Sequence, residues 1–476
     1  MPELESHYSH NLGQPAFPPL RMLKLEFLRY FARLSDREVI ARCQSDVLFR
    51  WFLQIPVRRA LPDPSSLTRF RGRLGPEGFS KLFDRLVGIA REHDLVKDRL
   101  RLKDATHVIA NIAVPSTIGL LASLRTKMLA AIKPIDPEAA IGFEIAAEQV
   151  RSETEAADPA IRLQARLDLV LDILHWIDQL SVPEEDQNDP SWNSLHRVAA
   201  LARKITGDCQ NPTAGHRTLS VVDPDARRGR HGEFYNGFLL DMMVDADSEI
   251  ITQLGVIDSG ADEARHAIDL IAKEQEAHGN DVQQISIDGI GFNGEVIAKL
   301  EDPAGPAAVD VITVPRDFSS QEGFSSASFK RSDDGLKVIC PAGQQSGLGH
   351  RNSKGNATQF AFAKATCAGC PLLTACLPKF SETSKKGRQV IKNDYEAQYE
   401  SIRRKSQTAA YQEVRRRHPM IERKLGEVVR HGGGRRAKYW GRAKVHIQEL
   451  MTGFVVNTRR IVKLLDDRRC AVPAIC

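Results

Sequence analysis

Three acidic residues lie where a carboxylate could hold a metal ion. Asp104 begins a β-rich segment, Asp288 follows the apolar run QISI, and Glu422 lies in an apolar helical pattern crowded with arginine and lysine. Carboxylates that converge from separate elements can hold two divalent cations about 4 Å apart, the arrangement that cleaves or joins phosphodiester bonds. Oxygen ligands suit Mg²⁺ or Mn²⁺. The structural alternative for each aspartate is a turn or cap, because aspartate at a strand end often bonds its own backbone.

The C-terminal part of the chain is strongly basic around Glu422. Residues 401–469 hold 19 Lys and Arg against 6 Asp and Glu, although the whole chain has a formal net charge of only +5. Such a field suits a polyanion, and arginines beside aromatic rings can clamp phosphates and stack on unpaired bases. The alternative is a solvated helix face. The candidate DNA-contacting residues are Arg69, Arg71, Arg435, Arg436, Lys438, Trp440, Arg442 and Lys444.

Four of the eight cysteines have a spacing typical of metal ligands. Cys340, Cys367, Cys370 and Cys376 form a C-x26-C-x2-C-x5-C pattern. Four thiolates that include one CxxC pair are compatible with a structural tetrahedral Zn²⁺ site, which would order a loop-rich segment. A cysteine-ligated iron–sulfur cluster is the second interpretation, and four unliganded thiols are the third.

The composition is that of a soluble globular protein. The chain has 476 residues, of which 42% are hydrophobic and 27% charged, enough for roughly two to four domains. No apolar run approaches the roughly 20 residues that span a bilayer. The polar, mildly acidic start MPELESHYSHNLGQ does not resemble a signal peptide, so eight cysteines point to a reducing cytoplasm.

The elements that must position these residues change along the chain. Residues 20–100 are predicted to be helical, with a capping box from Ser35 to Glu38 and a further helix that starts at Ser65 or Ser66. Residues 102–113 predict a strand. Residues 118–205 predict amphipathic helices, which we interpret as an inserted subdomain and scaffold. From residue 218, strands and helices alternate, which indicates α/β organisation with some parallel pairing.

Five sequence blocks resemble those of bacterial insertion-sequence DDE transposases, which have a ribonuclease-H-like catalytic core. The blocks are LFRWFLQIP with PDPSSLTRFRGRL, LKDATHVIANI, VVDPDARRGR followed by FYNGFLLDMMVDADSEIIT, SIDGIGFNGE, and IERKLGEVVRHGGGRRAKYWGRAKVHIQELMTGFVVNTRRIVKLL. The resemblance extends from about residue 20 to about residue 465. It is to the branch with a helical N-terminal domain and a cysteine-bearing insert, and the long last block is its most specific part.

The resemblance implies a role for each acid. Asp104, Asp288 and Glu422 match the first, second and third acids of the family, which would bind two Mg²⁺ (or Mn²⁺) ions. Glu427, five residues beyond Glu422, is the alternative third acid.

Three further positions bear on this assignment. Asp223 and Asp225 in DPDAR compete as metal ligands, with a surface turn as the structural alternative. Many family members carry tyrosine where this chain has Phe292 after the second-acid glycine. A hydroxyl contact at that position is therefore not expected from Phe292 itself.

The expected fold class is α/β (α+β overall), with a ribonuclease-H-like mixed sheet, a helical N-terminal domain, a helical insertion and a Cys-rich insert. The predicted divisions are a helical N-terminal DNA-binding domain (1–100), the first catalytic strand (101–117), the helical insertion (118–205), the ribonuclease-H-like core (206–316), the loop-rich Cys insert (317–392), the basic C-terminal helices with the third acid (393–469) and a tail (470–476).

The expected function is that of a DNA transposase with metal-dependent strand cleavage and strand transfer. The implied partners are double-stranded DNA, as transposon inverted-repeat ends and target, and further copies of the chain in a homodimer or larger synaptic assembly, with no membrane. The implied location is the bacterial cytoplasm, in association with the nucleoid. The alternatives are a catalytically inactive DNA-binding remnant and a ribonuclease-H-like nuclease without strand transfer.

Overall fold

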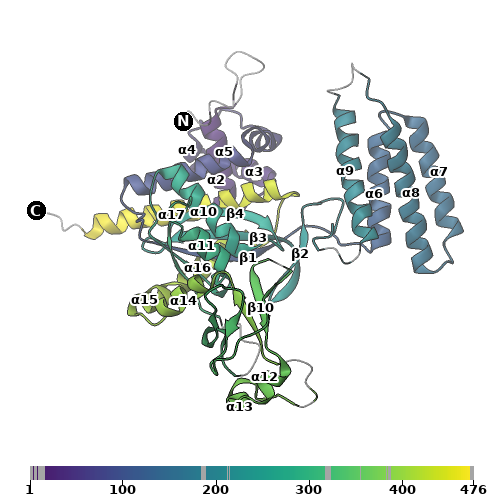
Figure 1. Cartoon of the computed structure of the whole chain (residues 1–476). Coiled ribbons are helices and arrows are strands. Elements are labelled where there is room, and N and C mark those ends of the chain that lie inside the picture. The colour runs from purple at the N-terminus through teal and green to yellow at the C-terminus, as the bar shows by residue number, and fades with distance from the viewer. Residues whose placement is uncertain are drawn as a thin grey trace, which may run out of the picture. The chain divides into compact units, whose positions relative to one another are not determined.

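The computed structural model describes Leu4, Tyr8 and residues 17–471, except 184–188, 212, 214, 317–322, 354, 382 and 384–386. The chain divides into two compact units (Figure 1). The first unit comprises residues 1–97, 104–262 and 421–476, and the second comprises residues 98–103 and 263–420. The expected α/β class is confirmed: 53% of the structure is helical and its sheet is mixed, consistent with a ribonuclease-H-like α+β fold. The domain divisions stay predictions, and residues 472–476 of the predicted tail lie outside the described residues.

The N-terminal region of the first unit is helical, as expected. Its helices are α2 (Pro19–Phe31), α3 (Asp36–Ser45), α4 (Val47–Leu53) and α5 (Ser65–Glu92). The Ser35–Glu38 capping box is present, with the Ser35 hydroxyl and the Glu38 carboxylate each accepting the other residue's backbone N–H. Helix α5 starts at Ser65 and is kinked at Gly75, whose φ of 61° lies in the left-handed region that favours glycine.

Two strands of the first unit, β3 (Glu233–Asp245, 13 residues) and β4 (Ile251–Asp258, 8 residues), are long and mostly buried. β2 (Arg227–His231), β3 and β4 form antiparallel pairs, and β3 also neighbours β1 (Leu100–Ile109). The 30-residue helix α17 (Arg442–Ala471) packs on α5 and β4. The Asn457 amide of α17 fixes this packing, because it donates to the backbone oxygen of Ile251 and accepts the N–H of Ile251, both at 2.8 Å.

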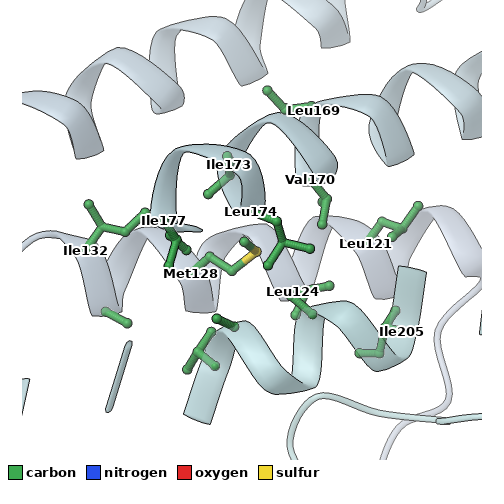
Figure 2. Close-up of a cluster of buried hydrophobic side chains, with 14 of the residues drawn as sticks. Leu121, Leu124, Met128, Ile132, Leu169, Val170, Ile173, Leu174, Ile177 and Ile205 are labelled. Carbon is green, nitrogen blue, oxygen red and sulfur yellow. The ribbon is translucent and has the colours of Figure 1, made fainter. Parts of the chain in front are cut away.

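The predicted helical insertion consists of α6 (Thr117–Ile132), α7 (Pro137–Glu153), α8 (Pro159–Gln179) and α9 (Pro190–Gln210). Ser116, Asp136, Asp158 and Asp189 each cap one of these helices through a side-chain oxygen. Proline occupies the first helical position of the last three helices, where its missing N–H costs no hydrogen bond. Leu124, Met128 and Leu174 interdigitate in their shared apolar core (Figure 2).

The second unit carries the parallel part of the sheet. The first residues of β1 pair in parallel with β5 (Gln284–Ile287), and β5 pairs in parallel with β6 (Asp310–Ile312). Helices α10 (Glu263–His278) and α11 (Gly294–Leu300) connect these strands. Arg101 of β1 is fully buried and forms an ion pair of 2.6 Å with the equally buried Glu274 of α10. This pair joins the first strand to its covering helix.

The Cys-rich segment of the second unit contains only short elements in the residues described. They are η3 (Ser326–Ser328), β7 (Lys330–Arg331), β8 (Val338–Ile339), β9 (His350–Arg351), β10 (Ala357–Ala361), α12 (Lys364–Ala368), α13 (Leu373–Cys376) and β11 (Gln389–Asn393). Helices α14 (Glu396–Lys405) and α15 (Ala409–Arg417) follow. The scarcity of regular structure agrees with the composition of this segment. In the described part of the chain, no helix is long and apolar enough to cross a membrane.

Candidate active site

Asp104 lies in the middle of β1, on the part of the strand that belongs to the first unit. Its neighbours Lys103 and Ala105 are buried, whereas Asp104 itself is half-buried. The backbone N–H of Ala105 donates to Oδ1 of Asp104 at 2.8 Å. A regular buried strand therefore fixes the backbone of this aspartate and leaves its carboxylate partly accessible.

The segment that follows Glu422 is tied to the same strand. Ile109 of β1 donates its N–H to the oxygen of Arg435 at 2.9 Å and accepts the N–H of Ala437 at 2.8 Å. The Arg435 guanidinium donates to Thr106 Oγ1 at 3.1 Å and to the backbone oxygen of His107 at 2.7 Å. Backbone and side-chain hydrogen bonds thus join the segment after Glu422 to β1 within the first unit.

Glu422 and Glu427 have different surroundings. Glu422 lies in the first turn of α16 (Pro419–Gly426), is exposed, and has no hydrogen bond or ion pair among the described residues. Glu427 begins η4 (Glu427–His431), a π-helical turn, and its Oε2 accepts from Lys424 Nζ at 2.7 Å. Because Lys424 already neutralises Glu427, Glu422 is the better candidate for a metal ligand.

A buried carboxylate lies under the glycine run 432–434. Glu449 of α17 is fully buried, and a side chain at Gly434 would collide with its Oε2. Burial raises the pKa of Glu449 to about 8, and hydrogen bonding from Gln448 and the charges of Lys438 and Arg435 oppose that rise. The glycine therefore leaves room for a carboxyl group that is protonated at neutral pH.

Asp288 follows β5 in the second unit and is half-buried. Its Oδ1 accepts the N–H of Ile290 at 3.0 Å, so Asp288 caps the single 3-10 turn η2 (Gly289–Gly291). Oδ2 of Asp288 has no protein partner among the described residues. Asp288 therefore caps the turn through Oδ1, and its Oδ2 is left to bind a ligand.

Side chains from α15 and the loop after β6 hold the backbone around Asp288. Arg415 donates to the backbone oxygen of Ile287 at 3.0 Å, and Thr313 Oγ1 donates to the backbone oxygen of Asp288 at 2.6 Å. His418 lies 3.0 Å from Ser286 Oγ through its Nδ1. Burial, with a smaller contribution from Arg415, lowers the pKa of His418 to about 4. This neutral imidazole and its neighbours support the strand end.

Phe292 has no hydroxyl group, but the neighbouring Tyr399 has one that bonds to the backbone of the same turn. Tyr399 of α14 packs its ring 4.8 Å from that of Phe292, and its hydroxyl accepts the N–H of Gly294 at 3.0 Å. A side chain at Gly294 would collide with Tyr395, so this close approach requires glycine. Helix α14 therefore anchors the turn that follows Asp288.

Asp225 lies in a turn and Asp223 directly precedes it, but Asp223 and Arg227 are buried, so this is not the surface turn of the structural alternative. Asp225 accepts the backbone N–H of Arg442 at 3.1 Å and so caps the start of α17. Asp223 is fully buried, and burial raises the pKa of its carboxyl group. Neither arrangement favours a metal ligand over a structural role.

Some of the candidate DNA-contacting side chains are exposed, and others are held by bonds to residues of the protein itself. Arg71 is buried, paired with Glu26 and Asp36, and stacked on Tyr439 at 5.3 Å, which does not fit phosphate contact. Arg435 holds β1, as described above. Arg442 is exposed but lies 3.3 Å from Asp258. Arg69, Arg436, Lys438, Trp440 and Lys444 are exposed.

Sequence reasoning missed several supporting residues. Arg415 and Arg435 looked like members of a basic surface, but both bond to strand backbones. No sequence motif marked Glu449 as a buried carboxyl group. In the described ranges, no three His, Cys, Asp or Glu side chains are already gathered closely enough to form a metal-binding group.

Two protein families match opposite ends of the chain. Residues 1–73 match the family described as Transposase domain (DUF772), and residues 339–462 match the family described as Transposase DDE domain. The second match contains Glu422 and the four clustered cysteines, whereas Asp104 and Asp288 lie outside both matches. No curated protein and no solved structure matches the chain. The family implies nuclease or transferase activity on DNA. These two matches and the mixed α/β fold support the resemblance of the chain to insertion-sequence DDE transposases.

Proposed function

We propose that the protein cleaves DNA at transposon ends and joins those ends to target DNA, with Asp104, Asp288 and Glu422 as the catalytic triad. One observation carries the proposal. Lys103 of β1 is the register partner of Ile287 of β5 on parallel strands, so the next residue along each strand is an aspartate. Asp288 directly follows the carboxyl end of β5, where sites form in α/β sheets, and Asp104 lies in the middle of the longer strand β1.

The donor set fits Mg²⁺ or Mn²⁺. The triad offers only carboxylate oxygens, the ligands these hard cations prefer. Glu422 and Oδ2 of Asp288 have no competing partner among the described residues. When bound, a pair of such ions activates a water or a 3′-hydroxyl and stabilises the leaving oxygen.

Other side chains of the protein would position the three carboxylates and bind the DNA. Arg435 holds the third-acid block against β1, and Arg415 with Thr313 holds the backbone at Asp288. The exposed Arg436 and Lys444 supply positive charge for the DNA backbone, and Trp440, 55% exposed, offers a ring for an unpaired base. Because two transposon ends must be joined, we propose that two or more copies act together.

The test uses DNA that carries the inverted repeats flanking the coding region. The proposal predicts strand cleavage that requires Mg²⁺ or Mn²⁺ and falls by at least about a hundredfold in Asp104→Asn, Asp288→Asn and Glu422→Gln. Glu427→Gln and Asp225→Asn are the matched controls and should retain cleavage.

Pre-cleaved ends separate the competing functions. Joining of such ends to a target plasmid supports a transposase. Cleavage without joining would identify a nuclease, and binding that persists in EDTA without any cleavage would identify an inactive remnant.

A further inference from the structure

Four cysteines from separate segments of the second unit line one small cavity. Cys340 follows β8, Cys367 lies in α12, Cys370 in the turn after it, and Cys376 at the end of α13. The cavity measures about 30 Å³, and its other lining residues are Phe329, Gln344, Phe362, Thr366, Leu373, Leu377 and Arg388. Among the residues that the structure describes, no carboxylate or imidazole lines this cavity. We infer that these four cysteines bind a single structural Zn²⁺ ion, a site separate from the proposed catalytic carboxylates.

Backbone N–H groups are directed at three of the four sulfurs. Gln344 donates to Cys340 Sγ at 3.3 Å, Arg388 to Cys367 Sγ at 3.3 Å, and Leu372 to Cys370 Sγ at 3.4 Å. A neutral thiol is a weak acceptor, whereas the thiolate is the metal-ligating form and gains from such donors. Groups that bond to the ligands in this way orient them and tune a metal centre.

Two glycines make these donors possible. Gly343 adopts a φ of 77° in the tight turn that returns the Gln344 N–H to Cys340. A side chain at Gly387 would lie 2.8 Å from Cys367 Sγ, so only glycine lets the chain pass this close to the sulfur. The two loops therefore bring backbone N–H groups close to the sulfurs of Cys340 and Cys367.

Charge and chemistry favour a thiophilic cation. Four thiolates around Zn²⁺ leave a net charge of −2, and the buried Arg388 lies beside them with its Nη1 3.1 Å from the backbone oxygen of Cys376. An all-sulfur donor set selects zinc or iron–sulfur clusters and not magnesium or calcium.

The size of the cavity bears on whether a single zinc ion or an iron–sulfur cluster fits between the cysteines. A volume of about 30 Å³ holds little more than one water-sized atom, which suits one ion with Zn–S bonds of about 2.3 Å. A [4Fe–4S] cluster places four iron and four sulfide atoms between its cysteines and would require a larger rearrangement of this cavity than a single ion. Binding would draw the sulfurs inward, because no three of them are yet gathered as a formed site.

A metal centre also accounts for how this segment holds together. Its strands have two to five residues, and its core has only six buried side chains in the described part: Phe329, Val338, Phe360, Phe362, Cys367 and Val390. Small cores of this kind usually need a metal or disulfides for stability. All four cysteines are free thiols in the structure.

The test is metal analysis of the full-length protein purified without added chelator. We expect about one zinc per chain, retained in Cys470→Ser, whose thiol is exposed and remote in sequence, and lost in Cys367→Ser. If Cys367→Ser fails to fold, the wild-type protein decides the question: Co²⁺ exchanged for zinc should give the charge-transfer and d–d bands of a tetrahedral tetrathiolate site.

Three results would overturn the inference. They are iron with inorganic sulfide in place of zinc, four alkylatable thiols with no metal in protein from zinc-replete cells, and disulfides between these cysteines. Zinc at one per chain that persists in Cys367→Ser would assign the ion to other residues.

Discussion

The Arg435 guanidinium donates to the backbone oxygen of His107 at 2.7 Å, and this bond joins the third-acid block to the strand that carries Asp104. The same Nη1 also donates to Thr106 Oγ1. Arg435→Ala should therefore lower the free energy of unfolding by about 1.5–3 kcal/mol, the range for hydrogen bonds that involve charged groups. Urea unfolding provides the measurement.

The neighbouring Arg436 is a matched control, because it is exposed and its side chain has no partner among the described residues. Arg436→Ala should change stability by no more than about 0.5 kcal/mol. Equal effects of the two substitutions would show that Arg435 does not anchor the strand.

The stability of the first unit should depend on pH through Glu449. Burial raises its folded pKa to about 8, so the folded state keeps a proton that the unfolded chain loses above pH 4.5. The stabilisation is complete below pH 4.5 and disappears as pH rises toward 8, by up to about 1.4 kcal/mol per pH unit.

Glu449→Gln keeps the shape of the protonated side chain and removes its titration. Denaturant unfolding at pH 5, 6, 7 and 8 should give a smaller loss of stability with pH for Glu449→Gln than for the wild type. Identical pH profiles would mean that Glu449 is ionised in the folded protein.

Arg71 and Arg69 lie on one helix but should respond differently to substitution. Arg71 is buried and pairs with Glu26 and Asp36, so Arg71→Ala leaves both carboxylates to Arg29 and should cost about 1.5–3 kcal/mol of stability. Arg69 is exposed, and Arg69→Ala should cost no more than about 0.5 kcal/mol. Thermal unfolding of both variants checks this, and a stable Arg71→Ala protein would refute the structural role.

DNA affinity should depend strongly on salt through the exposed basic residues of the C-terminal block. Each phosphate contact contributes about 0.9 to the slope of log K against log salt. Arg436→Ala and Lys444→Ala should each lower the slope by about that amount. Arg151→Ala, an exposed arginine of the helical insertion, is the control and should leave the slope unchanged. Unchanged slopes in all three variants would place the DNA elsewhere.

The sequence predicted the helices and strands better than the roles of individual arginine side chains. Periodicity and caps located α3, α5 and β5, since these signals are local in the chain. Nothing local distinguishes Arg71, buried against Glu26, from Arg69, exposed two residues earlier, because burial depends on residues distant in sequence. The resemblance favoured Glu422 over Glu427 as the third acid, and the Lys424–Glu427 ion pair adds a structural reason for that preference.

The central claim, that Asp288 binds the catalytic metal, is tested most directly by metal rescue of Asp288→Cys. A thiolate binds Mg²⁺ poorly and the softer Mn²⁺ better. The account predicts that strand cleavage by Asp288→Cys is lost in Mg²⁺ and largely restored in Mn²⁺, while Asp288→Asn stays inactive in both. Wild-type cleavage by Asp288→Cys in Mg²⁺, or equal inactivity in both metals, would contradict it.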